Sequence, residues 1–114
     1  MIGRSERMDG LSAAFLNAAG ANAFDFCDTH VPTVIHPTAP VAPALFALSE
    51  LRPVTGAELL LAFILGVELE CRIGRAISPG HYTKGWHITA TCGVLGAAAG
   101  TGKLVGLDDT RMVW

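Results

Sequence analysis

Basic clusters, paired cysteines and long hydrophobic runs are all missing from this 114-residue sequence. The eight lysine and arginine residues are scattered and the net charge is only -2, which argues against nucleic acid and anionic membrane as partners. The three cysteines, Cys27, Cys71 and Cys92, show no CxxC spacing, and no basic segment followed by an apolar run stands at the N-terminus. We therefore expect reduced thiols in a soluble, cytoplasmic protein.

Strand patterns and membrane-spanning runs are also scarce. The most apolar run, residues 59–67, is far shorter than the roughly 20 residues that a transmembrane helix needs, so we expect no membrane span. Apolar and polar residues almost never alternate with a period of two, and internal repeats are lacking. Because a half-buried strand requires that alternation, the sequence predicts an all-α fold, with residues 1–114 in one domain.

Two helices stand out in the pattern of residues. An Ala-rich helix is predicted over residues 11–24. A second helix is predicted over residues 57–77, where Thr55 precedes Glu58 by three positions and so matches a capping box. This second helix is apolar around nearly its whole circumference, and we therefore expect other helices to bury it on all sides.

Prolines and glycines predict two loops between the helices. Four prolines within residues 30–43 predict an extended loop, followed by a short helix over residues 42–51. A second loop follows the break at residues 78–80. From Thr89 onward a Gly/Ala-rich helix is predicted, and its glycines allow the backbone of a neighbouring helix to approach closely.

The two loops carry all four histidines of the chain. Their polar residues are Asp25, Asp28, Thr29, His30 and His36 around the first loop, and His81, Lys84 and His87 in the second. Imidazoles titrate near neutrality, so two converging loops would suit proton abstraction and return beside a substrate carboxylate. A single loop histidine is more often structural or solvated, and an aspartate near a helix end more often caps the helix. Both interpretations stay open at this point.

Metal binding is the main alternative chemistry for these residues. The suitable ligand types are Asp25, Cys27, His30, His36, His81 and His87. Both histidine pairs are six residues apart, which fits neither a helical i, i+4 pair nor the usual zinc spacing. We therefore expect no metal site.

Three ordered motifs, at residues 23–30, 36–40 and 80–87, resemble the MmgE/PrpD family. That family includes 2-methylcitrate dehydratase, cis-aconitate decarboxylase and iminodisuccinate epimerase, and the similarity runs over nearly the whole chain. The resemblance implies a large helical domain, of which this chain would be a portion, and a smaller α/β lid domain that would be absent. It also implies cofactor-independent chemistry on small polycarboxylates, with hydration or dehydration as the expected reaction.

By motif match, the resemblance places Asp25, Thr29, His36 and His87 at catalytic positions. His36 or His87 would act as acid or base, Thr29 would donate a hydrogen bond, and Asp25 would orient an imidazole. We expect Asp28, His30, His81 and Lys84 to contribute to substrate binding. The family's catalytic lysines have no counterpart in this chain. Two positions depart from the family pattern, since Cys27 replaces a common second aspartate and Asn22 a common histidine.

The sequence thus predicts part of an MmgE/PrpD lyase or isomerase that is inactive by itself. Its expected partners are a small polycarboxylate and either a second copy of the chain or the remainder of the enzyme. The alternative hypothesis is a non-catalytic helical module that oligomerises and retains the site residues of a parent enzyme. An exposed apolar end at Trp114 would favour self-association in either case.

Overall fold

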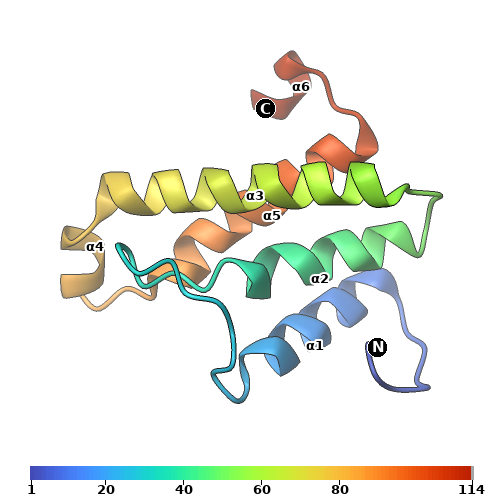
Figure 1. The fold of residues 1–114 in the computed structure, drawn as a ribbon, viewed down its shortest axis with the longest axis horizontal. Coiled ribbons are helices and arrows are strands. Elements are labelled where there is room, and N and C mark those ends of the chain that lie inside the picture. The colour runs from blue at the N-terminus through green and yellow to red at the C-terminus, as the bar shows by residue number, and fades with distance from the viewer. Residues whose placement is uncertain (114) are drawn as a thin grey trace.

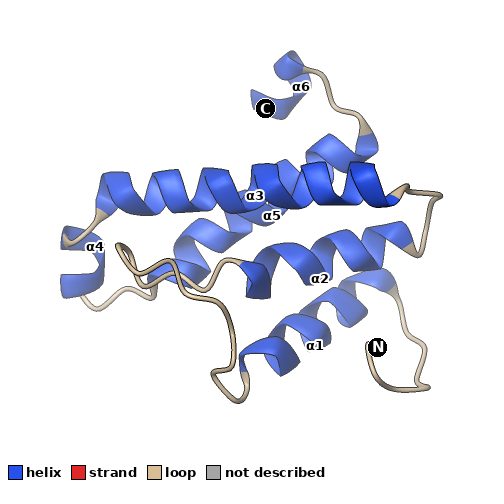
Figure 2. Ribbon diagram, viewed as in Figure 1, coloured by secondary structure: helices blue, strands red, loops and turns tan. Residues whose placement is uncertain are grey.

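The computed structural model describes residues 1–113, and within that range the chain forms helices and no strand (Figure 1, Figure 2). The helices are α1 (Gly10–Asn22), α2 (Thr38–Ser49), α3 (Gly56–Ile77), α4 (Gly80–Thr83), α5 (Ile88–Val105) and α6 (Asp109–Val113). In Figure 1, α3 crosses in front of α5, while α1 lies on the outer side of α2. The predicted all-α fold is confirmed.

Helix α3 begins with the predicted capping box. The Thr55 hydroxyl accepts from the Glu58 amide at 3.2 Å, and the Glu58 carboxylate accepts from the Thr55 amide at 2.8 Å. The expectation that other helices bury α3 on all sides is wrong, because Leu60, Leu61 and Ile64 are about half exposed. Helices α2 and α5 cover only part of its circumference, and one apolar face remains open to solvent.

Helices α3 and α5 cross with their backbones in contact. A Cβ atom on Gly66 would lie 2.7 Å from the carbonyl oxygen of Gly96, and one on Gly96 would lie 2.8 Å from that of Gly66. Real Cβ atoms do not approach that closely, so only glycine fits at either position. The close approach predicted from the glycines of α5 is confirmed. This contact holds α5 directly against α3.

Two small clusters of buried residues make up the core. One joins α2, α3 and α5 through Val41, Leu45, Ala62 and Leu104. The other contains Ile35, Ile88 and Cys92. Ile35 lies in the first loop and Ile88 follows the second, so the second cluster buries the ends of both loops against each other.

Helix α2 begins earlier than predicted. Residues 38–43 were expected to be an extended loop, but they already form the first turns of α2. Proline lacks only a donor that the first helical turn does not use, so Pro40 is compatible with this start. Pro43 lies further inside the helix and is buried in its packing. The first loop is therefore short, and His36 lies directly before the helix.

Helix α5 is, within residues 1–113, the one helix whose length and hydropathy would suffice for a membrane span. Half of this 18-residue window is buried inside the protein, against α2 and α3. Core helices pass the same length and composition test. We therefore interpret α5 as the central packing helix of this domain.

Candidate functional site

In the structure the first loop comprises residues 23–37, between α1 and α2, and it turns back on itself so that His36 lies near Cys27. Asp25 has a left-handed backbone (φ 57°), a conformation that aspartate adopts more readily than most residues. Further along, the His30 amide donates to the Ile35 carbonyl at 2.8 Å and closes a tight turn. This turn brings His36 back beside the residues that follow α1.

The imidazole of His36 lies at the centre of the first loop. Its Nδ1 atom is 3.1 Å from the Asp28 carbonyl oxygen, 3.2 Å from the Thr29 hydroxyl and 3.3 Å from the Cys27 sulfur. A carbonyl oxygen only accepts, so the Nδ1 proton is donated to Asp28. In the neutral ring that tautomer leaves a lone pair on Nε2. His36 is thus held through one nitrogen and can exchange a proton through the other.

The second loop is attached to the first through the His36 backbone. The His36 amide donates to the Thr89 hydroxyl at 3.1 Å, although 53 positions separate the two residues in sequence. His87 is the N-cap of α5, and its Nδ1 accepts from the Ala90 amide at 3.2 Å. Its Nε2 therefore carries the proton of the neutral ring, and the side chain is exposed. The structure thus brings the loops of His36 and His87 together.

Thr89→Val is expected to loosen the junction between the loops. Valine keeps the shape but leaves the His36 amide without its acceptor, which should lower the free energy of unfolding by about 1–2 kcal/mol. Urea denaturation would measure that loss, and the amide resonance of His36 should move in a ¹H–¹⁵N spectrum. Thr101→Val is the matched control, because the Thr101 hydroxyl bonds only carbonyls of its own helix. An equal loss in both variants would contradict this role for Thr89.

Four residues predicted to bind substrate are engaged elsewhere or stand alone. Asp28 accepts from the Thr38 amide at 3.2 Å and so satisfies a free donor at the start of α2. His30 bonds the Thr33 hydroxyl at 2.7 Å inside its own turn. The other two residues, His81 and Lys84, lie around the second loop. His81 stacks on Trp86 and lies 2.9 Å from the Thr91 hydroxyl, while Lys84 is exposed at the end of α4.

Glu70 is a buried acid that the sequence analysis missed. Its side chain is fully buried on α3, and neither carboxylate oxygen has a hydrogen-bond partner. Burial, and secondly the negative charge of Asp28, raise the pKa of Glu70 to about 8. A carboxyl group of this kind stays protonated at neutral pH. The spacing Gly66, Glu70, Gly74 was the available signal, because two glycines four residues either side mark a face in close contact with another segment.

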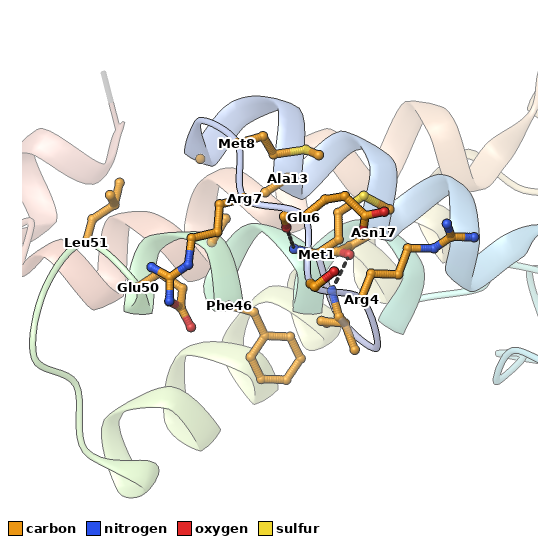
Figure 3. Close-up of a pocket in the computed structure, with 14 residues that line it drawn as sticks. Met1, Arg4, Glu6, Arg7, Met8, Ala13, Asn17, Phe46, Glu50 and Leu51 are labelled. Atoms are coloured by element: carbon orange, nitrogen blue, oxygen red, sulfur yellow. Dashed lines mark hydrogen bonds between the residues drawn. The ribbon is translucent and has the colours of Figure 1, made fainter.

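Three cavities elsewhere in the described part of the chain are lined by none of the predicted site residues. One of about 560 Å³ lies between the N-terminal segment, α1 and the end of α2 (Figure 3). Figure 3 shows its hydrogen bonds, in which the Met1 amine donates to the Glu6 carbonyl and the Ile2 amide donates to Asn17. The first bond lies within the N-terminal segment, and the second fastens that segment to α1. We therefore place the candidate site at His36.

Comparisons with known proteins agree with the motifs. The MmgE/PrpD N-terminal domain model matches residues 1–114. A cis-aconitate decarboxylase of Aspergillus terreus is 35% identical over 118 residues, covering 98% of this chain and 24% of the relative. The human cis-aconitate decarboxylase is 36% identical over 110 residues, covering 92% of this chain and 23% of the relative. The chain thus spans about a quarter of the length of these curated relatives.

Proposed function

Because this chain belongs to the MmgE/PrpD family, we propose that it forms part of a cofactor-independent lyase that decarboxylates cis-aconitate or a closely similar unsaturated polycarboxylate. The relatives named above are cis-aconitate decarboxylases, which favours decarboxylation over the dehydration expected from sequence. The observation that carries the proposal is the His36 ring, fixed through Nδ1 beside Thr29 and the Asp28 carbonyl.

The reaction needs one carbon–carbon bond to break and one carbon–hydrogen bond to form. When a carboxylate leaves cis-aconitate as CO₂, its electron pair stays on carbon and is delocalised over the adjacent double bond and carboxylate. A proton must then reach a carbon atom of this delocalised system, and a protonated imidazole can supply it. His36 is the proposed proton donor, and Thr29 is proposed to hydrogen-bond to the substrate. Asp25, with a carboxylate oxygen within 4.8 Å of a His36 ring nitrogen, is proposed to orient the imidazole. His87 is the proposed second acid or base.

Substrate carboxylates need cations that the neighbourhood of His36 provides only sparsely. Lys84 is the proposed contact from the second loop, with His81 as a weaker contributor. Each missing charge-assisted contact costs about 1.5–3 kcal/mol of binding. We therefore expect the 114-residue chain alone to show no turnover, and we propose the remainder of the enzyme as its functional partner.

A chimera tests this function directly. Residues 1–114 would replace the matching segment of the Aspergillus terreus cis-aconitate decarboxylase, which supplies the other three quarters of the protein. We expect the chimera to release CO₂ from cis-aconitate, and the isolated chain to release none. Dehydration of 2-methylcitrate is the competing reaction, and the absorbance of the new double bond measures it.

Two results would contradict the proposal. A folded chimera that dehydrates 2-methylcitrate but leaves cis-aconitate intact would reassign the reaction. Turnover by the isolated chain would mean that the carboxylate-binding groups lie within these 114 residues.

A non-catalytic oligomerisation module remains the second candidate, and exposed apolar side chains favour it. Leu11 and Phe15 on α1 are 86% and 71% exposed, and the open face of α3 carries further apolar residues. Trp114, which was also expected to favour association, lies outside the described residues. Sedimentation of the isolated chain, together with the activity of the chimera, distinguishes the two candidates. A non-catalytic module would form a defined oligomer by itself, and the chimera that contains it would be inactive.

A further inference from the structure

We propose that Asp25, Cys27 and His36 form a binding site for one divalent transition-metal ion of the zinc type, and that the bound ion blocks proton exchange at His36. The inhibitory part rests on the function proposed above, whereas metal binding does not. The sequence analysis named these three residues among the possible ligands, but it rejected a metal site on the spacing of the histidine pairs alone.

The ligand atoms of the three side chains already lie at distances from one another that are close to those in a zinc site. One ligand atom from each residue lies within 4.8 Å of those of the other two. The Cys27 sulfur is 3.3 Å from His36 Nδ1 and 4.0 Å from an Asp25 carboxylate oxygen. In a tetrahedral site with zinc–sulfur and zinc–nitrogen bonds of about 2.3 and 2.1 Å, the sulfur and nitrogen lie roughly 3.5 Å apart. The Asp25 side chain is exposed, and a tetrahedral site would bring its oxygen roughly 0.5 Å closer to the sulfur than the 4.0 Å observed.

A fourth ligand is available beside the sulfur. The side-chain oxygen of Asn22 is 3.6 Å from Cys27 Sγ, and an amide oxygen or a water molecule completes many sites of this kind. Thiolate and carboxylate together neutralise a doubly charged ion. The thiolate favours zinc and cobalt over magnesium and calcium, which prefer oxygen ligands.

Metal binding and proton transfer compete for the same ring. The ion would take the lone pair of His36 Nδ1, which the neutral ring exposes only when its proton moves to Nε2. That change ends the donation from Nδ1 to the Asp28 carbonyl. With both nitrogens occupied, His36 can no longer take up and return a proton.

Cys27 is the one thiol of the chain suited to this role. Cys71 and Cys92 are buried, and burial raises the pKa of both, that of Cys71 to about 11. They therefore remain protonated thiols inside the core. Cys27 is only partly buried, and its sulfur faces the cluster. A metal–thiolate signal from this protein consequently reports on Cys27.

Cobalt titration of the reduced 114-residue chain tests metal binding without any assay of activity. We expect one equivalent of Co²⁺ to produce a thiolate-to-cobalt absorption band in the near ultraviolet, and Zn²⁺ to displace it. Cys27→Ser should abolish the band and lower zinc affinity about 100-fold, and Asp25→Asn should weaken binding about tenfold. Cys92→Ala is the matched thiol control and should leave the band unchanged. Circular dichroism would establish that each variant is folded.

Alkylation of the unmodified chain provides a second measurement that needs no variant. Zn²⁺ should slow iodoacetamide modification of Cys27 at least tenfold, as read by peptide mass. No cobalt band, a band that persists in Cys27→Ser, or no protection of Cys27 would each overturn the site. In an active chimera, metal binding without loss of turnover would overturn the inhibition alone. An inactive chimera that still binds metal would instead count against the proposed function.

Discussion

His36→Gln in the active chimera is expected to lower kcat for cis-aconitate decarboxylation by about 10²- to 10⁴-fold. Glutamine retains a donor for the Asp28 carbonyl, so the loop should keep its conformation. The glutamine side chain cannot take up and return a proton. Substrate binding should change much less, because the amide preserves most of the shape of the site. Steady-state kinetics with cis-aconitate would separate kcat from KM.

His30→Gln is the matched control for that substitution. His30 lies in the same loop, but its ring bonds the Thr33 hydroxyl within its own turn. We expect the kcat of the His30→Gln chimera to stay within about fivefold of that of the parent chimera, because His30 takes no part in the proposed proton transfer. Equal losses of kcat in both variants would mean that the loop, and not proton transfer at His36, determines the rate.

The stability of the isolated chain is expected to fall by about 3 kcal/mol as the pH rises from about 5 to about 8, owing to Glu70. The folded-state pKa of Glu70 is raised to about 8, whereas its ordinary value is 4.5. Between these values the folded chain keeps a proton that the unfolded chain releases. Stability is therefore highest at low pH in this window and decreases as the pH rises through it. Relaxation around the ionised carboxylate limits the loss to less than the full shift implies.

Glu70→Gln should remove most of this pH dependence. The amide has a similar shape and does not ionise, so its free energy of unfolding should change little between about pH 5 and about pH 8. Urea denaturation followed by circular dichroism at several pH values measures the slope. Glu68→Gln is the control, because Glu68 is exposed on the same helix and pairs with Arg72. A slope that is identical in Glu70→Gln and the unmodified chain would contradict this account.

Local patterns predicted the helices well where short-range contacts decide the structure. The Thr55 and Glu58 capping box specified the start of α3 correctly, since both of its hydrogen bonds lie within one turn. The prolines were less informative about α2. Pro40 and Pro43 suggested a loop, but the burial of Pro43 in the packing of α2 outweighed their local preference.

The candidate site shows the same division between local and long-range effects. The motif identified His36 and Thr29, and the structure places their side chains in contact. Asp28 and His30 were assigned to substrate binding from the same segment, yet one satisfies the start of α2 and the other closes a turn. Residue type alone does not distinguish these uses, because the partner in each case is set by the path of the backbone.

The sequence by itself determined the all-α fold, the position of the capping box and the family, because each depends on residue types at short or ordered spacings. Only the tertiary structure decided that His36 bonds Thr89 across 53 positions, and that Glu70 is buried at the crossing of α3 and α5. The physical reason is that both depend on contacts between segments far apart in sequence. The first depends on how α5 meets the start of α2, and the second on the close approach of α3 and α5 at Gly66 and Gly96, which removes the Glu70 carboxyl group from water.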